Sequence, residues 1–103
     1  MVIHLQKKYL REYLEKRGIK VKHPFIVTKI FIALKDIANR DEMFSCHDLI
    51  SYFERDQPSI VTIGSYLSRI EKLGIIEKVE NTRYPYFYRV KDSFQDFMKN
   101  LGL

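Results

Sequence analysis

Residues 59–74 read SIVTIGSYLSRIEKLG, and the rest of the chain is expected to hold this stretch in place. At about 100° per residue, Ile63, Leu67 and Ile70 fall on one side of a helix, which is therefore apolar. The other side carries a valine, small hydroxyl groups, a tyrosine and two cations: Val61, Thr62, Ser65, Tyr66, Ser68, Arg69 and Lys72. A helix face turned only to water is usually richer in Glu and Lys. The pattern therefore indicates contact with another molecule.

Both ends of this helix are marked in the sequence. Ser59 is placed to cap the first turn, and Gly74 favours the left-handed conformation that ends a helix. Two short runs of β-branched and aromatic residues follow, at 75–79 (IIEKV) and 86–90 (YFYRV). They predict a β-hairpin whose polar tip is formed by residues 80–85.

This arrangement resembles the recognition helix and wing of the winged helix-turn-helix DNA-binding proteins. The family pattern is a spaced set of aliphatic residues, a glycine and two aliphatics entering the wing, here Ile63, Leu67, Ile70, Gly74, Ile75 and Ile76. In size and Lys/Ile-rich composition the chain looks like the small stand-alone regulators of archaea, archaeal viruses and bacteria. The resemblance implies a mainly α fold with a small β-hairpin (α+β): a winged helix-turn-helix with extra N- and C-terminal helices.

The residues before the recognition helix supply the remaining elements of such a core, which we place at residues 24–90. A helix over 25–38 is apolar nearly all round and belongs at the centre. Met43 and Phe44 predict a short strand. Ser45 with Asp48 three residues later is a capping signature, so a second helix is expected from residue 46 to about residue 54.

Amphipathic helices are expected at both ends of the single domain 1–103. One covers 3–17, within the N-terminal segment 1–23, and the other covers 93–101, capped by Ser93, within the C-terminal segment 91–103. Two interpretations of their apolar stripes stay open. They pack on their own domain, or they form the interface of a homodimer, as implied by the resemblance. The interface residues would be Leu5, Tyr9, Tyr13, Phe94, Phe97 and Leu101.

Positive charge is unevenly distributed along the chain. The net charge is +5, and Lys and Arg are in excess over residues 1–29 and 59–91, whereas acidic residues are in excess over 30–58. Such clustering is typical of a phosphate-binding surface, although many basic proteins bind no nucleic acid. No apolar run approaches the roughly 20 residues of a membrane span. A cytoplasmic protein is expected, associated with the nucleoid, or in the host cytoplasm if viral.

Signals of catalysis and metal binding are weak. The three histidines are far apart, Cys46 is the only cysteine, and the four glycines form no phosphate-binding loop. With one cysteine, the chain cannot form an intrachain disulfide, but two copies could be joined through Cys46. Asp36 with Asp41 and Glu42 could be a carboxylate pair, but solvated charge is the better interpretation. We therefore expect no enzyme, no cofactor and no metal.

The resemblance implies a partner, double-stranded DNA, and a set of contacts. On the recognition helix these are Ser59, Val61, Thr62, Ser65, Tyr66, Arg69 and Lys72; on the wing they are Lys78, Asn81, Thr82 and Arg83. Arg69 would read a guanine, Val61 would meet a thymine methyl group, and Lys72 would reach a phosphate. Gly64, mid-helix, indicates close approach of a neighbouring helix or of DNA.

The function expected is that of a dimeric transcriptional regulator that binds double-stranded DNA sequence-specifically. It would place helix 59–73 in the major groove and the wing at 80–85 on the backbone or in the minor groove. Two alternatives remain open: a winged-helix protein–protein interaction module of a larger assembly, and a non-specific architectural DNA binder. A stacking platform for single strands, made by Tyr84, Tyr86 and Tyr88, is a further hypothesis, but alternation along a hairpin would turn these rings toward the core.

Overall fold

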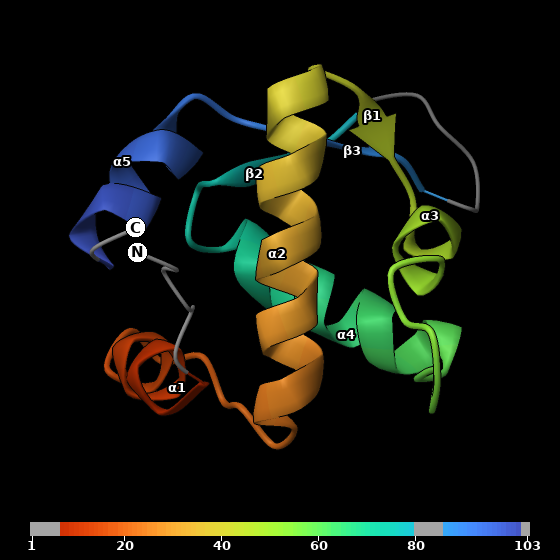
Figure 1. Cartoon of the computed structure of the whole chain (residues 1–103). Coiled ribbons are helices and arrows are strands. Elements are labelled where there is room, and N and C mark those ends of the chain that lie inside the picture. The colour runs from red at the N-terminus through yellow and green to blue at the C-terminus, as the bar shows by residue number, and fades with distance from the viewer. Residues whose placement is uncertain (1–6, 80–85, 102–103) are drawn as a thin grey trace, which may run out of the picture.

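The structure is a computed structural model that describes residues 7–79 and 86–101 (Figure 1). Within them the chain forms α1 (Lys7–Glu15), α2 (Pro24–Arg40), β1 (Met43–Phe44), α3 (Cys46–Ile50), α4 (Ile60–Glu71), β2 (Ile76–Lys78), β3 (Tyr88–Val90) and α5 (Ser93–Asn100). The described residues thus make a compact α+β globule of five helices and one three-stranded antiparallel sheet. At this level the predicted fold class is confirmed.

Helix α2 is the centre of the molecule. It crosses the middle of Figure 1, with α1 and α5 on one side and α3 on the other. Pro24 opens it, since proline is pre-set for a first helical turn, and Asp41 ends it in the left-handed conformation at φ 52°. Seven of its residues are buried: Val27, Thr28, Ile30, Phe31, Ala33, Leu34 and Ile37. The prediction of a central apolar helix is confirmed.

The sheet has the strand order β1-β3-β2. The predicted hairpin pairs Ile76 with Val90 and Lys78 with Tyr88. The predicted short strand adds to the other edge of β3, where Phe44 lies opposite Tyr88. Their rings stack at 5.8 Å between centroids, which fastens β1 to the hairpin.

Helix α3 begins as predicted and ends early. The capping box is formed, because Ser45 N–H donates to Asp48 Oδ2 at 2.8 Å and Asp48 N–H donates to Ser45 Oγ. The helix ends at Ile50, four residues before the predicted end. Ser51 Oγ donates to the carbonyl of Asp48 at 2.7 Å, and the chain then tightens into turns that bury Phe53.

Helix α4 begins at the predicted cap and ends at Glu71, two residues before the predicted end at residue 73. The Thr62 N–H donates to Ser59 Oγ at 3.1 Å, and Gly74 has φ 77°. Its apolar side is buried as predicted, at Ile63, Leu67 and Ile70.

The terminal helices pack against each other and against α2. The centroid of the Phe97 ring lies 5.3 Å from that of Tyr13, in an edge-to-face arrangement. It lies 5.7 Å from the centroid of Phe31, and these two rings are stacked. The structure corrects the prediction for Phe94, Phe97 and Leu101 as interface residues, because their side chains are buried within the one chain. Tyr13 is half-buried on Phe97, and the homodimer stays a prediction. These contacts match the other interpretation, packing within the domain. Leu5 and the side chain of Tyr9 lie outside the described residues.

The predicted cap of α5 is also corrected. Asp92 occupies the N-cap position, without a side-chain cap hydrogen bond. Ser93 Oγ instead donates to the carbonyl of Gly74 at 2.6 Å, so the start of α5 is tied to the turn that ends α4.

Substitution by alanine should change the stability of the protein in opposite directions at Gly64, within α4, and at Gly74, just after it. A Cβ at Gly64 would lie 3.6 Å from Cys46 Sγ, an ordinary contact, and alanine is favoured in a helix interior. We expect Gly64→Ala to raise the free energy of unfolding by about 0.5–1 kcal/mol. Urea unfolding followed by circular dichroism measures it.

Gly74→Ala is the matched control. Because Gly74 has φ 77°, a Cβ there is strained, and we expect a loss of about 1–2 kcal/mol. Destabilisation by both substitutions would mean that Gly64 is required for the packing of α3 against α4.

Candidate nucleic-acid interface

The exposed face of α4 has the composition of a contact surface. Val61 is 81% exposed, and Ser65, Ser68 and Lys72 are exposed along the same side of the helix. Thr62 and Arg69 flank them and are half-buried, and no carboxylate lies among these six residues. The face therefore offers one bare apolar side chain, several hydroxyl groups and two cations. We name these six residues the α4 face.

A basic segment lies along one edge of this face. In residues 19–22, which connect α1 to α2, buried Ile19 and Val21 alternate with exposed Lys20 and Lys22. Arg69 Nη1 donates to the carbonyl of Lys20 at 3.1 Å, so the connector runs beside α4. Two more cations therefore border the α4 face.

Sequence reasoning missed these two lysines. Their signal is present in the sequence, because Ile-Lys-Val-Lys alternates with a period of two, the pattern of an extended segment with one buried side. Nothing local in the sequence, however, indicates which element this buried side meets.

Tyr66 does not belong to the interface, which corrects its prediction as a DNA contact. Its side chain is only 3% exposed. The phenol oxygen accepts hydrogen bonds from the backbone N–H groups of Lys22, at 3.1 Å, and His23, at 3.0 Å. It also lies 3.2 Å from His23 Nδ1, within hydrogen-bond distance. Tyr66 therefore holds the connector against α4.

Arg69 is oriented by the same contacts. Its guanidinium carbon lies 5.4 Å from the centre of the Tyr66 ring, and one of its five N–H donors is directed to Lys20. Its side chain therefore leans toward the connector edge of the α4 face. The guanine contact stays a prediction.

The hairpin lies at the opposite edge of the α4 face. Lys78 Nζ is 4.3 Å from the centre of the Tyr86 ring, and Tyr86 is 44% exposed. Tyr88 is buried against Phe44, so it is not available for stacking with a base. The predicted wing residues Asn81, Thr82 and Arg83, together with Tyr84, lie outside the described residues.

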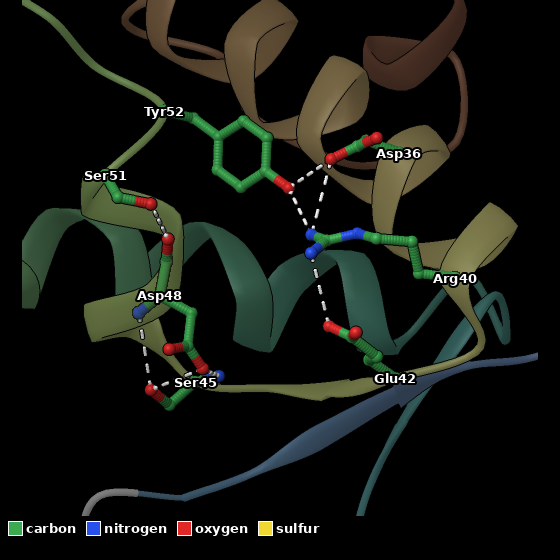
Figure 2. Close-up of polar contacts among 7 residues, drawn as sticks. All are labelled: Asp36, Arg40, Glu42, Ser45, Asp48, Ser51 and Tyr52. Carbon is green, nitrogen blue, oxygen red and sulfur yellow. Dashed lines mark hydrogen bonds and ion pairs between the residues drawn. The ribbon is translucent and has the colours of Figure 1, made fainter.

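Two acidic residues from the middle of the chain, Asp36 and Glu42, belong to a network apart from the α4 face (Figure 2). Arg40 pairs with Asp36 and with Glu42, at 3.3 Å in each case, and donates to the hydroxyl of Tyr52 at 2.7 Å. Tyr52 donates to Asp36 at 2.5 Å, and burial together with this bond raises the pKa of Tyr52. Asp36 and Glu42 thus converge on Arg40 at half-exposed positions.

Other kinds of site find little support in the same stretches of chain. In residues 7–79 and 86–101 no group of three or more His, Cys, Asp or Glu side chains is arranged to hold a metal ion. Cys46 is half-buried, and burial raises the pKa of its thiol. None of the helices described above has both the length and the apolar character needed to cross a membrane.

Compared with known proteins, the chain matches no protein-family model, no curated protein and no solved structure. What it does must therefore be inferred from its own geometry and charge.

The contact between Tyr66 and the connector gives a stability prediction. Tyr66→Phe removes the acceptor of two backbone N–H groups, so we expect the free energy of unfolding to fall by about 1–3 kcal/mol. Denaturant unfolding followed by circular dichroism measures it.

Tyr13→Phe is the control, because its hydroxyl accepts a hydrogen bond from Arg17 Nη2 at 2.7 Å in an exposed position, and a change within about 0.5 kcal/mol is expected there. Equal changes at the two positions would show that the Tyr66 hydroxyl contributes nothing to holding the connector.

Proposed function

We propose that the protein is a winged-helix DNA-binding protein that places the exposed face of α4 in the major groove of duplex DNA. The observation that carries the proposal is the α4 face itself: its six residues include no carboxylate, and lysines border it on both edges. Lys20 and Lys22 stand on the connector edge and Lys78 on the hairpin edge. A phosphate backbone runs along each edge of a major groove, so cations on both edges of the α4 face suit duplex DNA.

The order of elements supports the proposal. From α2 to β3 the chain runs helix, strand, helix, helix, strand, strand, and β1 joins the hairpin on β3. This is the order expected from the resemblance over residues 24–90. In that arrangement the helix before the hairpin is the one that enters the groove.

The dimensions of α4 fit a groove. Its 12 residues make a helix about 18 Å long, and the major groove is about 12 Å wide. Its first turn, with Ser59 and Val61, would approach base edges, while Lys72 near the other end would reach phosphates. Ser65 lies between them.

Val61 gives the proposal a chemical test. Val61, in the first turn of the helix proposed to enter the groove, is 81% exposed, so its apolar side chain is left in water. The thymine 5-methyl group is the apolar group that base pairs display in the major groove. Val61 would therefore contact a thymine.

One observation favours the non-specific alternative. Arg69, the residue best suited to read guanine, already directs a donor to the connector. Without Arg69, the α4 face and its borders consist mostly of lysines and small hydroxyl groups. Contacts of these groups with phosphates position a protein on DNA without reading the sequence. The regulatory role, the homodimer and a place in the cytoplasm beside the genome belong to the sequence-specific form of the proposal.

Binding to a randomised duplex library, at several salt concentrations, tests the proposal. We expect a steep fall in affinity with salt, and Lys20→Gln with Lys22→Gln should flatten the slope by about 1.8. The reason is that two phosphate contacts, and with them the release of their counterions, are lost.

The matched control is Lys35→Gln with Lys99→Gln, which removes the same charge at exposed positions on α2 and α5. Equal losses from both pairs would show that net charge alone drives binding. No binding of any duplex at low salt would exclude the DNA proposal and leave the protein-interaction module.

Replacing thymine by deoxyuridine tests the role of Val61, because the two bases differ only by the 5-methyl group. In a selected duplex we expect one such replacement to weaken binding about fourfold, the effect of one buried methyl group of about 0.8 kcal/mol. Val61→Ala should remove most of this difference. A binding constant unchanged at every replaced thymine would exclude a methyl contact by Val61.

A further inference from the structure

A recess lies between α3, α4 and the hairpin, beside the α4 face. Its volume is about 300 Å³. It is lined by Cys46, His47, Ile60, Val61, Gly64, Ser68, Lys78, Tyr86 and Tyr88. The volume is at the lower end of the range for small-molecule sites, so it suits one small molecule and excludes a large one.

The lining of this recess is positive. It includes one cation, Lys78, and no carboxylate. Three other recesses in the described stretches of the chain each include two or more carboxylates. Among these four recesses it is therefore the one whose charge favours an anion.

The inner wall of the recess is apolar and aromatic. Tyr88 is buried and Ile60 half-buried, whereas Tyr86 and Val61 are more exposed and lie nearer the opening. Gly64 adds no side chain to the α4 wall of the recess, and a Cβ there would lie 3.6 Å from Cys46 Sγ. Lys78 is held above the Tyr86 ring, 4.3 Å from its centre, so a cation stands next to an aromatic surface.

We propose that this recess binds a small flat aromatic anion, a molecule of one or two fused rings that carries one carboxylate. The rings pack on Tyr86, Tyr88 and Ile60, and the carboxylate pairs with Lys78. The neutral surface supplies most of the contact area, and the lysine selects a ligand with negative charge over a neutral ligand of the same shape.

Ligand binding would also regulate the α4 face. Val61 and Ser68 belong both to that face and to the lining of the recess. A molecule in the recess and a duplex on α4 would therefore exclude each other. This regulatory aspect rests on the proposed function, whereas binding of the anion does not.

Cys46 provides the readout, because it lines the recess and is the only cysteine in the chain. Its rate of alkylation by N-ethylmaleimide is measured at one alkaline pH, since burial raises the pKa of the thiol. The probe is 2-naphthoate, and naphthalene-2-methanol is the neutral molecule of similar shape. We expect 2-naphthoate to slow alkylation several-fold at saturation and the alcohol to slow it much less.

Lys78→Gln should abolish the difference between the two probes. Lys72→Gln is the matched control: Lys72 is also an exposed cation beside the recess on α4, but it does not line it, so the difference should persist. Amide NMR shifts on addition of 2-naphthoate, expected at Gly64, Ser68 and Lys78, follow binding independently of the thiol. Circular dichroism establishes that both variants are folded.

Three results would overturn the proposal: alkylation and NMR shifts unaffected by 2-naphthoate, equal protection by the neutral alcohol, or full protection retained in Lys78→Gln. The DNA experiment is read separately. If no duplex binds, the DNA proposal fails and thiol protection still decides the recess. If duplex binds and 2-naphthoate protects Cys46 without weakening DNA binding, mutual exclusion fails and the anion site stands.

Discussion

One phenol oxygen fixes the geometry on which the candidate site depends. Tyr66, from α4, accepts two backbone hydrogen bonds from the connector between α1 and α2. The connector is thereby held to α4, and the lysines that alternate with its buried residues are brought to the edge of the α4 face. A buried acceptor that serves two donors is costly to lose, because both N–H groups would remain desolvated without a partner. The positive border of the α4 face therefore follows from a contact inside the protein.

This contact also marks the limit of what the sequence could predict. The caps at Ser45 and Ser59 and the left-handed Gly74 were predictable because each depends on residues within one turn. Tyr66 was not, because it lies at the border of the buried and exposed sides of α4, and only the position of a segment more than 40 residues earlier decides which side receives its ring. Phe94 and Phe97 show the same limit: an apolar stripe indicates that it will be buried, but not in which chain.

The acidic and basic parts of the sequence lie on different surfaces of the protein. The acidic middle of the chain supplies Asp36 and Glu42 to a network centred on Arg40, and none of its members comes from α4, the connector or the hairpin (Figure 2). Half-exposed ion pairs of this kind add little to stability. Asp36 and Glu42 are thereby paired away from the α4 face, while Glu71 on α4 and Glu77 on β2 remain the carboxylates nearest to it in the sequence.

Gly64 connects stability with the two proposed ligands. A glycine in a helix interior costs about 1 kcal/mol relative to alanine, so its presence needs a reason. Packing does not supply one, because a Cβ would meet Cys46 Sγ only at 3.6 Å, an ordinary contact distance. The space kept open by Gly64 belongs instead to the recess beside the α4 face. Because core packing does not require Gly64, we infer that its role is to leave room for the ligand proposed to bind in the recess.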